Sequence, residues 1–163
     1  QSISDQGIGD LDLRTVLKAS QAIAGEIALD KLLTKMMHIV IENVGARNGF
    51  LILAQGGEWI IDAIADVDKS KVQVLQSISI EANDTVSAGI IHYVARTQET
   101  IVLADAANEG GFKDDLNIQQ RRAKSILCAP LINQGKVSGI VYLENNLAAG
   151  VFTHERVELL NLL

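Results

Sequence analysis

Two stretches of this chain combine an apolar run, a short glycine-containing turn and a second apolar run. They are "GFLILAQGGEWIIDAIA" (49–65) and "SILCAPLINQGKVSGIVYLENN" (125–146). Apolar runs of this length bounded by turn residues favour strands, and glycine tolerates the positive φ that tight hairpins require. Hairpins at both ends of the strand-rich region predict an antiparallel sheet with its helices segregated to the side. That is the α+β class, and a doubly wound parallel sheet is not expected.

The segments before the first hairpin have helical periodicity. Residues 10–27 predict a connector helix with an apolar seam at intervals of three and four. The seam consists of Leu13, Val16, Ser20, Ile23 and Ile27. Residues 28–44 predict a second helix that stops before Gly45, and residues 1–9 are a leader with no predicted element.

Three elements follow the first hairpin. "VQVLQSISI" (72–80) predicts a strand, and "NDTVSAGIIHYVARTQE" (83–99) predicts a helix with Asn83 or Asp84 as its N-cap. "TIVLAD" (100–105) predicts a short strand.

The longest polar segment, residues 106–123, predicts a loop with a short helix. Its basic stretch "QQRRAK" is interpreted as a solvated helix face. The last helix begins with Thr153 as its N-cap and keeps its apolar spacing as far as Leu163. We therefore expect this helix to be truncated here and to continue in a longer protein.

Composition excludes several classes of protein. The 163 residues carry a formal net charge of −6, which argues against a nucleic-acid surface. No apolar run approaches the ~20 residues needed to span a bilayer, and the first residues do not resemble a signal peptide. One cysteine excludes an intramolecular disulfide and favours a reducing compartment. We expect a cytoplasmic protein with neither nucleic acid nor membrane as a partner.

No enzyme site emerges from the residue pattern. His38, His92 and His154 lie in three different predicted helices, with no second ligand at metal spacing. The chain has no nucleophile elbow, P-loop or dinucleotide fingerprint. Four acids in the polar segment lack the spacing of a calcium loop, and a solvated loop is the favoured interpretation. These acids are Asp105, Glu109, Asp114 and Asp115. We predict no catalytic residue and no metal site.

Cys128 is the only cysteine, and it lies inside the second hairpin. A reactive cysteine has cations or a helix N-terminus nearby. The neighbours of Cys128 are apolar on both parities of the strand. This predicts a strand buried on both faces, where cysteine acts as a small apolar filler. A redox role and a chromophore anchor are the alternatives.

The second hairpin closely resembles the last two strands of GAF domains, in which Ser-x-Leu-x-x-Pro-Leu precedes a glycine turn, a strand and an Asn. "SAGIIHYVARTQETIVLADA" is similar to the family's middle helix and short strand, and "LDKLLTKMMHIVIENVGARNGFLIL" to its first helix and strand. The resemblance covers residues 28–163. "LKASQAIAGEIALDKLL" and "YLENNLAAGVFTHERVELL" look most like the GAF modules of bacterial multi-sensor hybrid kinases, which join serine/threonine-kinase and histidine-kinase regions.

The resemblance implies a six-stranded antiparallel sheet with the terminal helices on one face. On the other face, the middle helix and the polar loop would roof a pocket. Ser87, Phe112 and Tyr142 are expected to line that pocket, with Asp105 at its rim. Tyr142 falls where related domains place a residue that contacts a nucleotide base.

The same resemblance bears on two ligands of the family. Bilin-binding members carry a Cys in the segment before the penultimate strand, here "LNIQQRRA", which has none, so covalent bilin is not expected. Cyclic-nucleotide-binding members carry Asn-Lys and then Phe followed by Asp-Glu. This chain matches at Asn145 and Phe152, but it has Asn146 in place of the Lys and Arg156-Val157 in place of the acidic pair. The identity of any cofactor stays open.

By resemblance, the chain is a non-catalytic regulatory sensor domain of a larger signal-transduction protein, with kinase regions of the same chain as partners. A receptor for a cyclic nucleotide or another small molecule is one alternative, and a purely structural dimerisation module is another. An enzyme of the free methionine sulfoxide reductase type would need several cysteines. We expect a homodimer through the helical ends, because a two-fold axis would bring the seams of two copies together.

Overall fold

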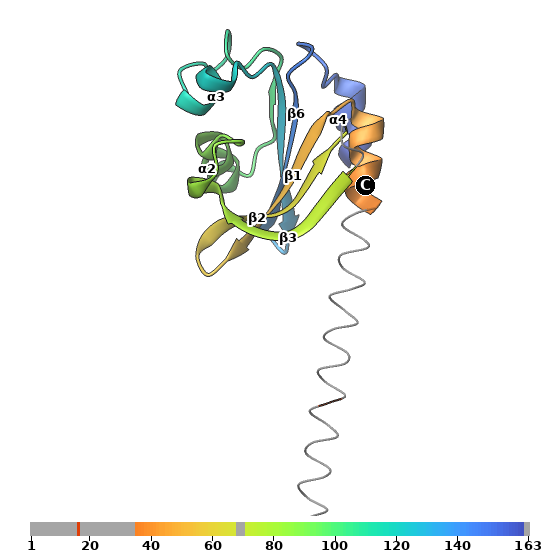
Figure 1. Cartoon of the computed structure of the whole chain (residues 1–163), viewed down its shortest axis with the longest axis vertical. Coiled ribbons are helices and arrows are strands. Elements are labelled where there is room, and N and C mark those ends of the chain that lie inside the picture. The colour runs from red at the N-terminus through yellow and green to blue at the C-terminus, as the bar shows by residue number, and fades with distance from the viewer. Residues whose placement is uncertain (1–15, 17–34, 68–70, 162–163) are drawn as a thin grey trace, which may run out of the picture. The chain divides into compact units, whose positions relative to one another are not determined.

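The computed structural model describes residue 16, residues 35–67 and residues 71–161. The chain divides into two compact units, Gln1–Leu33 and Thr34–Leu163, and the second unit carries the sheet (Figure 1). Within the predicted seam, Val16 is helical and 58% exposed. The other four residues of the seam lie outside the described residues.

Six strands form one antiparallel sheet in the order β3-β2-β1-β6-β5-β4. They are β1 (Asn48–Gln55), β2 (Glu58–Asp66), β3 (Lys71–Ser79), β4 (Ile101–Leu103), β5 (Ser125–Asn133) and β6 (Lys136–Asn145). The two predicted hairpins are β1–β2 and β5–β6, and they join in the middle of the sheet where β1 pairs with β6. The predicted α+β class and the six-stranded antiparallel sheet are confirmed.

Both hairpins turn through two consecutive residues with positive φ. These are Gly56 and Gly57 in the first hairpin, with φ of 59° and 80°, and Gln134 and Gly135 in the second, with φ of 53° and 78°. Turns of this kind match the right-handed twist of the paired strands. The glycines therefore allow the tight hairpin turns that the sequence predicts.

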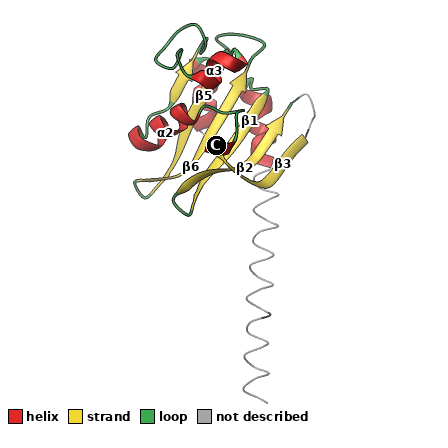
Figure 2. Ribbon diagram, turned by 60° about the vertical axis from the view of Figure 1, so that its left-hand side comes forward, coloured by secondary structure: helices red, strands yellow, loops and turns green. Residues whose placement is uncertain are grey.

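Helices cover the two faces of the sheet (Figures 1 and 2). A short 3₁₀ turn, η1 (Ile80–Ala82), leads to α2 (Ala88–Thr97), and α2 lies with α3 (Leu116–Arg121) on one face. The helix of residues 35–44 and α4 (His154–Asn161) lie on the other face. This is the layered arrangement that the family resemblance implies.

Side chains of the central strands point alternately to the two faces of the sheet. Each face therefore has its own set of buried residues. Phe50 and Ile52 of β1 belong to one buried cluster with the apolar face of α2. Gly49 faces the opposite side, where a Cβ atom would lie only 2.8 Å from the Cε of Met37. The side chains of Met37 and Ile41 from the helix of residues 35–44 therefore pack directly over Gly49, where a larger residue would displace them.

Two details of the predicted elements were wrong. The N-cap of α2 is Ser87, whose hydroxyl accepts from the backbone N–H of Ile90 at 3.2 Å, and not Asn83 or Asp84. The side chain of Asn83 instead accepts from the backbone N–H of Thr85 at 2.6 Å, which forms a tight turn ahead of the helix. The predicted N-cap of α4 is confirmed, since the Thr153 hydroxyl accepts from the N–H of Arg156 at 3.4 Å.

The second detail concerns β5, which was expected to be buried along its length. Ser125–Ala129 is buried, whereas residues 131–133 are exposed. They approach the tight β5–β6 turn, where the strand is exposed to solvent. The apolar run in the sequence continues past the end of the core.

Gly139 provides a test of the packing between β1 and β6. A Cβ atom on Gly139 would lie 3.0 Å from the Cδ2 of Leu53 and 3.3 Å from the backbone oxygen of Ile52. We expect Gly139→Ala to lower the free energy of unfolding by about 1–3 kcal/mol, because β1 must shift to make room. Urea unfolding followed by circular dichroism measures this loss.

The matched control is Gly111→Ala, because no heavy atom lies within 4 Å of a Cβ at that position. Both substitutions restrict the unfolded chain in the same way, so their difference reports the native contact. Equal unfolding midpoints for the two variants would contradict the predicted close contact.

Candidate functional site

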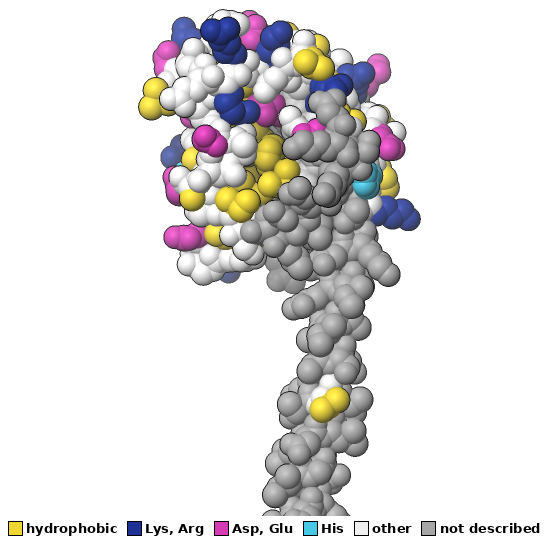
Figure 3. Space-filling model, viewed as in Figure 1, with side chains coloured by type: hydrophobic (Ala, Val, Ile, Leu, Met, Phe, Trp, Pro, Cys, Tyr) yellow, Lys and Arg dark blue, Asp and Glu magenta, His cyan; other side chains and the backbone are white. Residues whose placement is uncertain are grey.

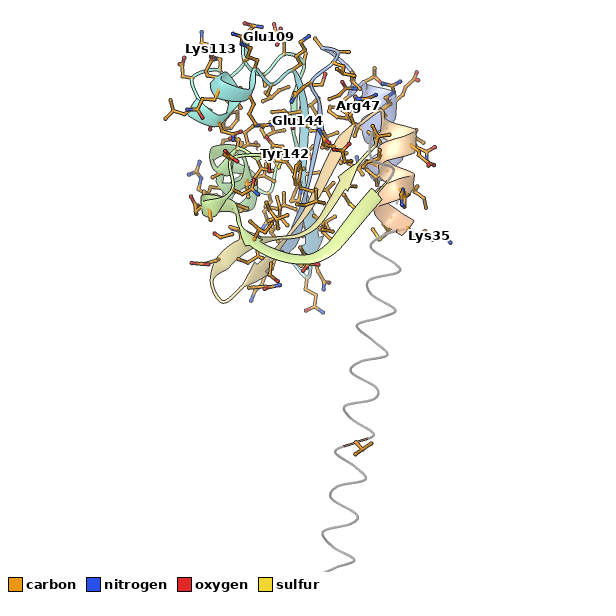
Figure 4. All side chains as sticks on the ribbon, in the orientation of Figure 1. Lys35, Arg47, Glu109, Lys113, Tyr142 and Glu144 are labelled. Carbon is orange, nitrogen blue, oxygen red and sulfur yellow. The ribbon has the colours of Figure 1, made fainter. Side chains whose placement is uncertain are left out.

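Tyr142 lies on β6, on the sheet face that α2 covers, as predicted, and its side chain is fully buried (Figure 4). Its phenol oxygen accepts a hydrogen bond from the backbone N–H of Ser87 at 3.3 Å. The ring packs edge-on against Phe50, with ring centroids 6.0 Å apart. Tyr142 therefore fills the space beneath the N-terminus of α2.

Ser87 joins the two helices of this face. Its hydroxyl caps α2 and donates to the Oδ2 of Asp115 at 2.9 Å. Asp115 is in turn the N-cap of α3, because its Oδ1 accepts from the backbone N–H of Ile118 at 3.1 Å. Both helix N-termini are thus held by one short chain of polar groups.

An ion pair connects the other end of α3 to the sheet. Nη1 of Arg121 donates to both carboxylate oxygens of Glu144, at 2.6 and 2.7 Å, and Nε donates to the Oδ1 of Asn117 at 3.0 Å. The Glu144 side chain is 2% exposed and that of Arg121 is 21% exposed. The interpretation of "QQRRAK" as a solvated face is therefore wrong for Arg121, which points inward because a buried carboxylate needs a cation.

The buried polar groups alter one another's ionisation. Burial raises the pKa of the Tyr142 phenol well above its ordinary value, and the negative charge of Glu144 raises it further. Burial lowers the pKa of Arg121, but its hydrogen bond and attraction to Glu144 outweigh this and leave the pKa raised. At neutral pH the Arg121 guanidinium is therefore charged and the Tyr142 phenol is neutral.

A cleft of about 290 Å³ opens beside the ion pair. Its walls include Asn48, Phe50, Asp66, Thr85, Arg121 and Glu144. It has polar amides, an aromatic ring and charged groups of both signs, which is the mixed lining of small-molecule sites. Tyr142 and Ser87 lie behind this cleft and do not line it.

A second and shallower cleft of about 510 Å³ lies at the N-termini of α2 and α3. Its walls include Val86, Gly89, Asp115 and Leu116.

Figure 3 shows that Lys, Arg, Asp and Glu side chains alternate over the visible face of the domain. Apolar side chains gather near its centre.

The four residues predicted to line one pocket are not all brought together. Ser87 and Tyr142 are hydrogen-bonded, whereas Phe112 packs its ring edge-on against Tyr93 on α2, with centroids 5.6 Å apart. Oδ2 of Asp105 accepts from the side chain of Asn108 at 3.0 Å, within its own loop. Oδ1 of Asp105 is buried and has no hydrogen-bond partner among the described residues. The assignment of all four residues to a ligand stays a prediction.

Cys128 is fully buried in the same core as Tyr142, which is its partner across the β5–β6 pair. Burial raises the pKa of its thiol far above the ordinary value, so the thiol is neutral at physiological pH. Only a thiolate is a good nucleophile. The position and protonation of Cys128 support the predicted role of apolar filler.

The three histidines are exposed. His92 lies 2.6 Å from a carboxylate oxygen of Glu81, and His154 lies 3.1 Å from that of Glu158, at the surface. Across the described part of the chain, no three His, Cys, Asp or Glu side chains are grouped to hold a metal ion. No helix in the same part of the chain is long and apolar enough to cross a membrane.

Residues that match the cyclic-nucleotide pattern (Asn145) and residues that differ from it (Asn146 and Arg156) all bind the backbone of neighbouring segments. Nδ2 of Asn145 donates to the backbone oxygen of Gly45 at 3.0 Å, and Oδ1 of Asn146 accepts from the N–H of Lys124 at 2.9 Å. Nη1 of Arg156 donates to the backbone oxygen of Val151 at 2.7 Å. These polar side chains tie together the segments that enter and leave the sheet.

This sheet, with two helices tied over one face and terminal helices on the other, defines a sensor-type α+β domain. The chain belongs to the GAF domain family, which matches residues 28–163. It is therefore a regulatory sensor domain, as the sequence resemblance predicts. The family assignment rests on most of the chain and agrees with the architecture.

The relatives are signalling proteins. Hybrid signal transduction histidine kinase G from Dictyostelium discoideum is 23% identical over 100% of this chain and 8% of the relative. A probable 3′,5′-cyclic phosphodiesterase, pde-5, from Caenorhabditis elegans is 31% identical over 79% of this chain and 18% of the relative. The chain thus spans less than a fifth of either relative. The kinase relative is eukaryotic, so the greater likeness to bacterial hybrid kinases stays a prediction.

Among solved structures, the GAF domain of a two-component sensor histidine kinase from Bacillus halodurans has a similar fold. The TM-score is 0.57 at 15% identity, over 82% of this chain and 86% of that chain. At this level of identity the similarity shows the fold alone.

Neither Arg121 nor Glu144 was among the site residues predicted from the sequence. One signal was present: Glu144 has the same strand parity as Tyr142 in "GIVYLENN", so a carboxylate was placed on a buried face. A buried carboxylate requires a cation, and the polar segment before the hairpin has two adjacent arginines. Which arginine turns inward depends on the helix phase of α3, which the sequence pattern did not define.

Cys128→Ala tests the assignment of the thiol as filler. We expect the variant to fold and to lose about 1 kcal/mol of unfolding free energy, because a small cavity replaces the sulfur atom. A thiol reagent should label the native wild-type chain slowly and the urea-unfolded chain rapidly. Rapid stoichiometric labelling of the native protein at neutral pH would mean that Cys128 is reactive.

Proposed function

We propose that this GAF domain is a non-catalytic module of a larger cytoplasmic signalling protein, a kinase, and that it relays the state of its pocket through its terminal helices. In this proposal residues 10–27 are the connector helix, residues 28–163 are the sensor, and the kinase regions of the same chain are its partners. The Dictyostelium kinase supports the proposal, because its similarity extends over the whole chain.

The observation that carries the proposal is the junction of both terminal helices with the sheet. Gly45, at the end of the helix of residues 35–44, accepts from the side chain of Asn145 on β6 at 3.0 Å. Nη1 of Arg156 on α4 reaches so close to Gly45 that a Cβ there would lie 2.7 Å away. Gly45 has a φ of 86°. Three segments therefore meet at one point, so a change at β6 can reach both helical ends.

Self-association through residues 10–27 is part of this proposal. The seam of Leu13, Val16, Ser20, Ile23 and Ile27 has the spacing that left-handed helix pairs require. Val16 is an exposed apolar side chain on a helix, which is consistent with a surface that a second copy covers. A dimer would convert a small shift at the junction into a shift between paired helices.

Sedimentation of the wild type beside a Leu13→Glu/Ile23→Glu variant tests this assembly. We expect a dimer for the wild type at micromolar concentration and a folded monomer for the variant, because buried glutamates would repel each other across the seam. A matched control is Leu116→Glu, since Leu116 is 76% exposed on α3, outside the seam. A folded wild-type monomer, or dissociation of the control as well, would contradict a helical dimer.

A second candidate function is a small-molecule receptor, which the cleft beside Arg121 and Glu144 favours. The relation to a cyclic phosphodiesterase adds a cyclic nucleotide to the classes to be tested. In this candidate, Ser87 and Tyr142 contact the ligand once the overlying helix N-termini move. Phe112 then lines the same pocket, with Asp105 at its rim.

Native mass spectrometry of the purified domain separates this candidate from a purely structural module. A receptor should carry a co-purifying molecule that is lost on denaturation, or should take up added cyclic nucleotide at micromolar concentration. Arg122→Gln, at the exposed residue that directly follows α3, should bind as the wild type does. The mass of the bare chain under every condition would support the structural module instead.

A further inference from the structure

Glu144 binds two different parts of the domain, one through its side chain and one through its backbone. Its carboxylate binds Arg121 on α3, and its backbone oxygen accepts from the N–H of Arg47 at 2.9 Å. Figure 4 shows Glu144 between Tyr142 and Arg47 in the view. One connection reaches the helices that cover the pocket face, and the other reaches the segment that follows the helix of residues 35–44.

On the pocket side, α3 is held chiefly by side chains. α2 lies against β5 and β6, whereas α3 does not pack its backbone closely on any described strand. Its attachments include the Ser87–Asp115 hydrogen bond at one end, the Arg121–Glu144 pair at the other, and the buried side chain of Ile118. The side chains of Asn117 and Gln119 add hydrogen bonds to the backbone oxygens of Asp84 and Ala107 in the neighbouring loops. A short helix held in this way can move without unfolding the sheet.

On the opposite side, the backbone around Arg47 links the strands to the terminal helices. The backbone oxygen of Arg47 accepts from the N–H of Val67 at 2.8 Å, just past β2. The neighbouring Gly45 is held by Asn145, which directly follows Glu144 on β6. A displacement of Glu144 therefore acts on the junction where Gly45, Asn145 and Arg156 meet.

With α3 in its observed position, one buried hydrogen-bond donor lacks an acceptor. Nη2 of Arg121 is buried and finds no hydrogen-bond acceptor among the described residues. The Tyr142 phenol lies near the guanidinium, and its bond to the Ser87 N–H is long at 3.3 Å. A buried donor without an acceptor lowers the stability of the state that contains it.

We infer that the Arg121–Glu144 ion pair couples the position of α3 over the pocket to the Gly45–Arg47 junction of the terminal helices. While the pair is formed, α3 is closed and β6 holds the junction in place. When α3 moves away, the Glu144 carboxylate loses its cation, and the end of β6 loosens together with the N–H of Arg47. This inference rests on the proposed sensor function, for which it supplies the route from pocket to helices.

Amide hydrogen exchange measured by NMR tests the coupling in the folded domain. The reporters are the N–H of Ala123, which donates to Ile118 at the end of α3, and the N–H of Arg47. The reference is Val94, which is fully buried inside α2. The test variant is Arg121→Gln, and the matched control is Arg122→Gln, at the exposed neighbouring arginine.

In Arg121→Gln, we expect exchange at both Ala123 and Arg47 to accelerate on the order of tenfold or more, because a buried carboxylate has lost its partner. Val94 should be unchanged, and Arg122→Gln should exchange as the wild type does at all three amides. Arg121→Lys, which keeps the charge but not the planar fork, should give intermediate rates and serves if Arg121→Gln fails to fold.

Acceleration at Ala123 without any at Arg47 would overturn the coupling, and so would equal acceleration at Val94, which would mean a general loss of stability. Either result leaves the proposed sensor function standing, because that function is tested separately by sedimentation and by mass spectrometry. Joint acceleration at Ala123 and Arg47 alone supports the inference.

Discussion

The burial of the Glu144 carboxylate is the constraint on which the pocket face depends. A charge this deeply buried is tolerated only when it is paired and hydrogen-bonded. Arg121 supplies the cation, which sets the orientation of α3, and Asp115 at the other end of α3 ties that helix to Ser87 on α2. The position of α3 over the sheet thus depends on one charged side chain on β6, whereas α2 packs on β5 and β6 through its own apolar face.

Groups that could perform chemistry elsewhere are used here for architecture. The thiol of Cys128 is buried and protonated, and the phenol of Tyr142 accepts a bond from a helix N-terminus. The carboxylate of Asp115 caps a helix, and the exposed His92 and His154 pair with surface glutamates. The phenol and the carboxylate thus hold the N-termini of α2 and α3 in position.

The local pattern of apolar and turn residues in the sequence predicted the fold well. The two hairpins, the sheet and the burial of Cys128 all follow from strand periodicity and glycine turns, which depend on neighbours in sequence. The Ser87 cap was missed because Asn83 and Asp84 are equally good caps in isolation, and only tertiary packing placed the helix start at Ala88. The Arg121–Glu144 pair joins residues 23 positions apart, so no local pattern could identify it. The strands and turns of the domain are therefore easier to predict from the sequence than the long-range polar contacts that could change the position of α3.

Tyr142 occupies the space that the fold would otherwise leave beneath α2, with its ring buried and its oxygen bound to Ser87. The domain thus contains a tethered competitor for that space. An intramolecular group acts at an effective concentration in the millimolar range or above, so a free molecule must bind tightly or be abundant to displace it. The threshold at which such a domain would respond is then a property of the tyrosine as much as of any incoming molecule.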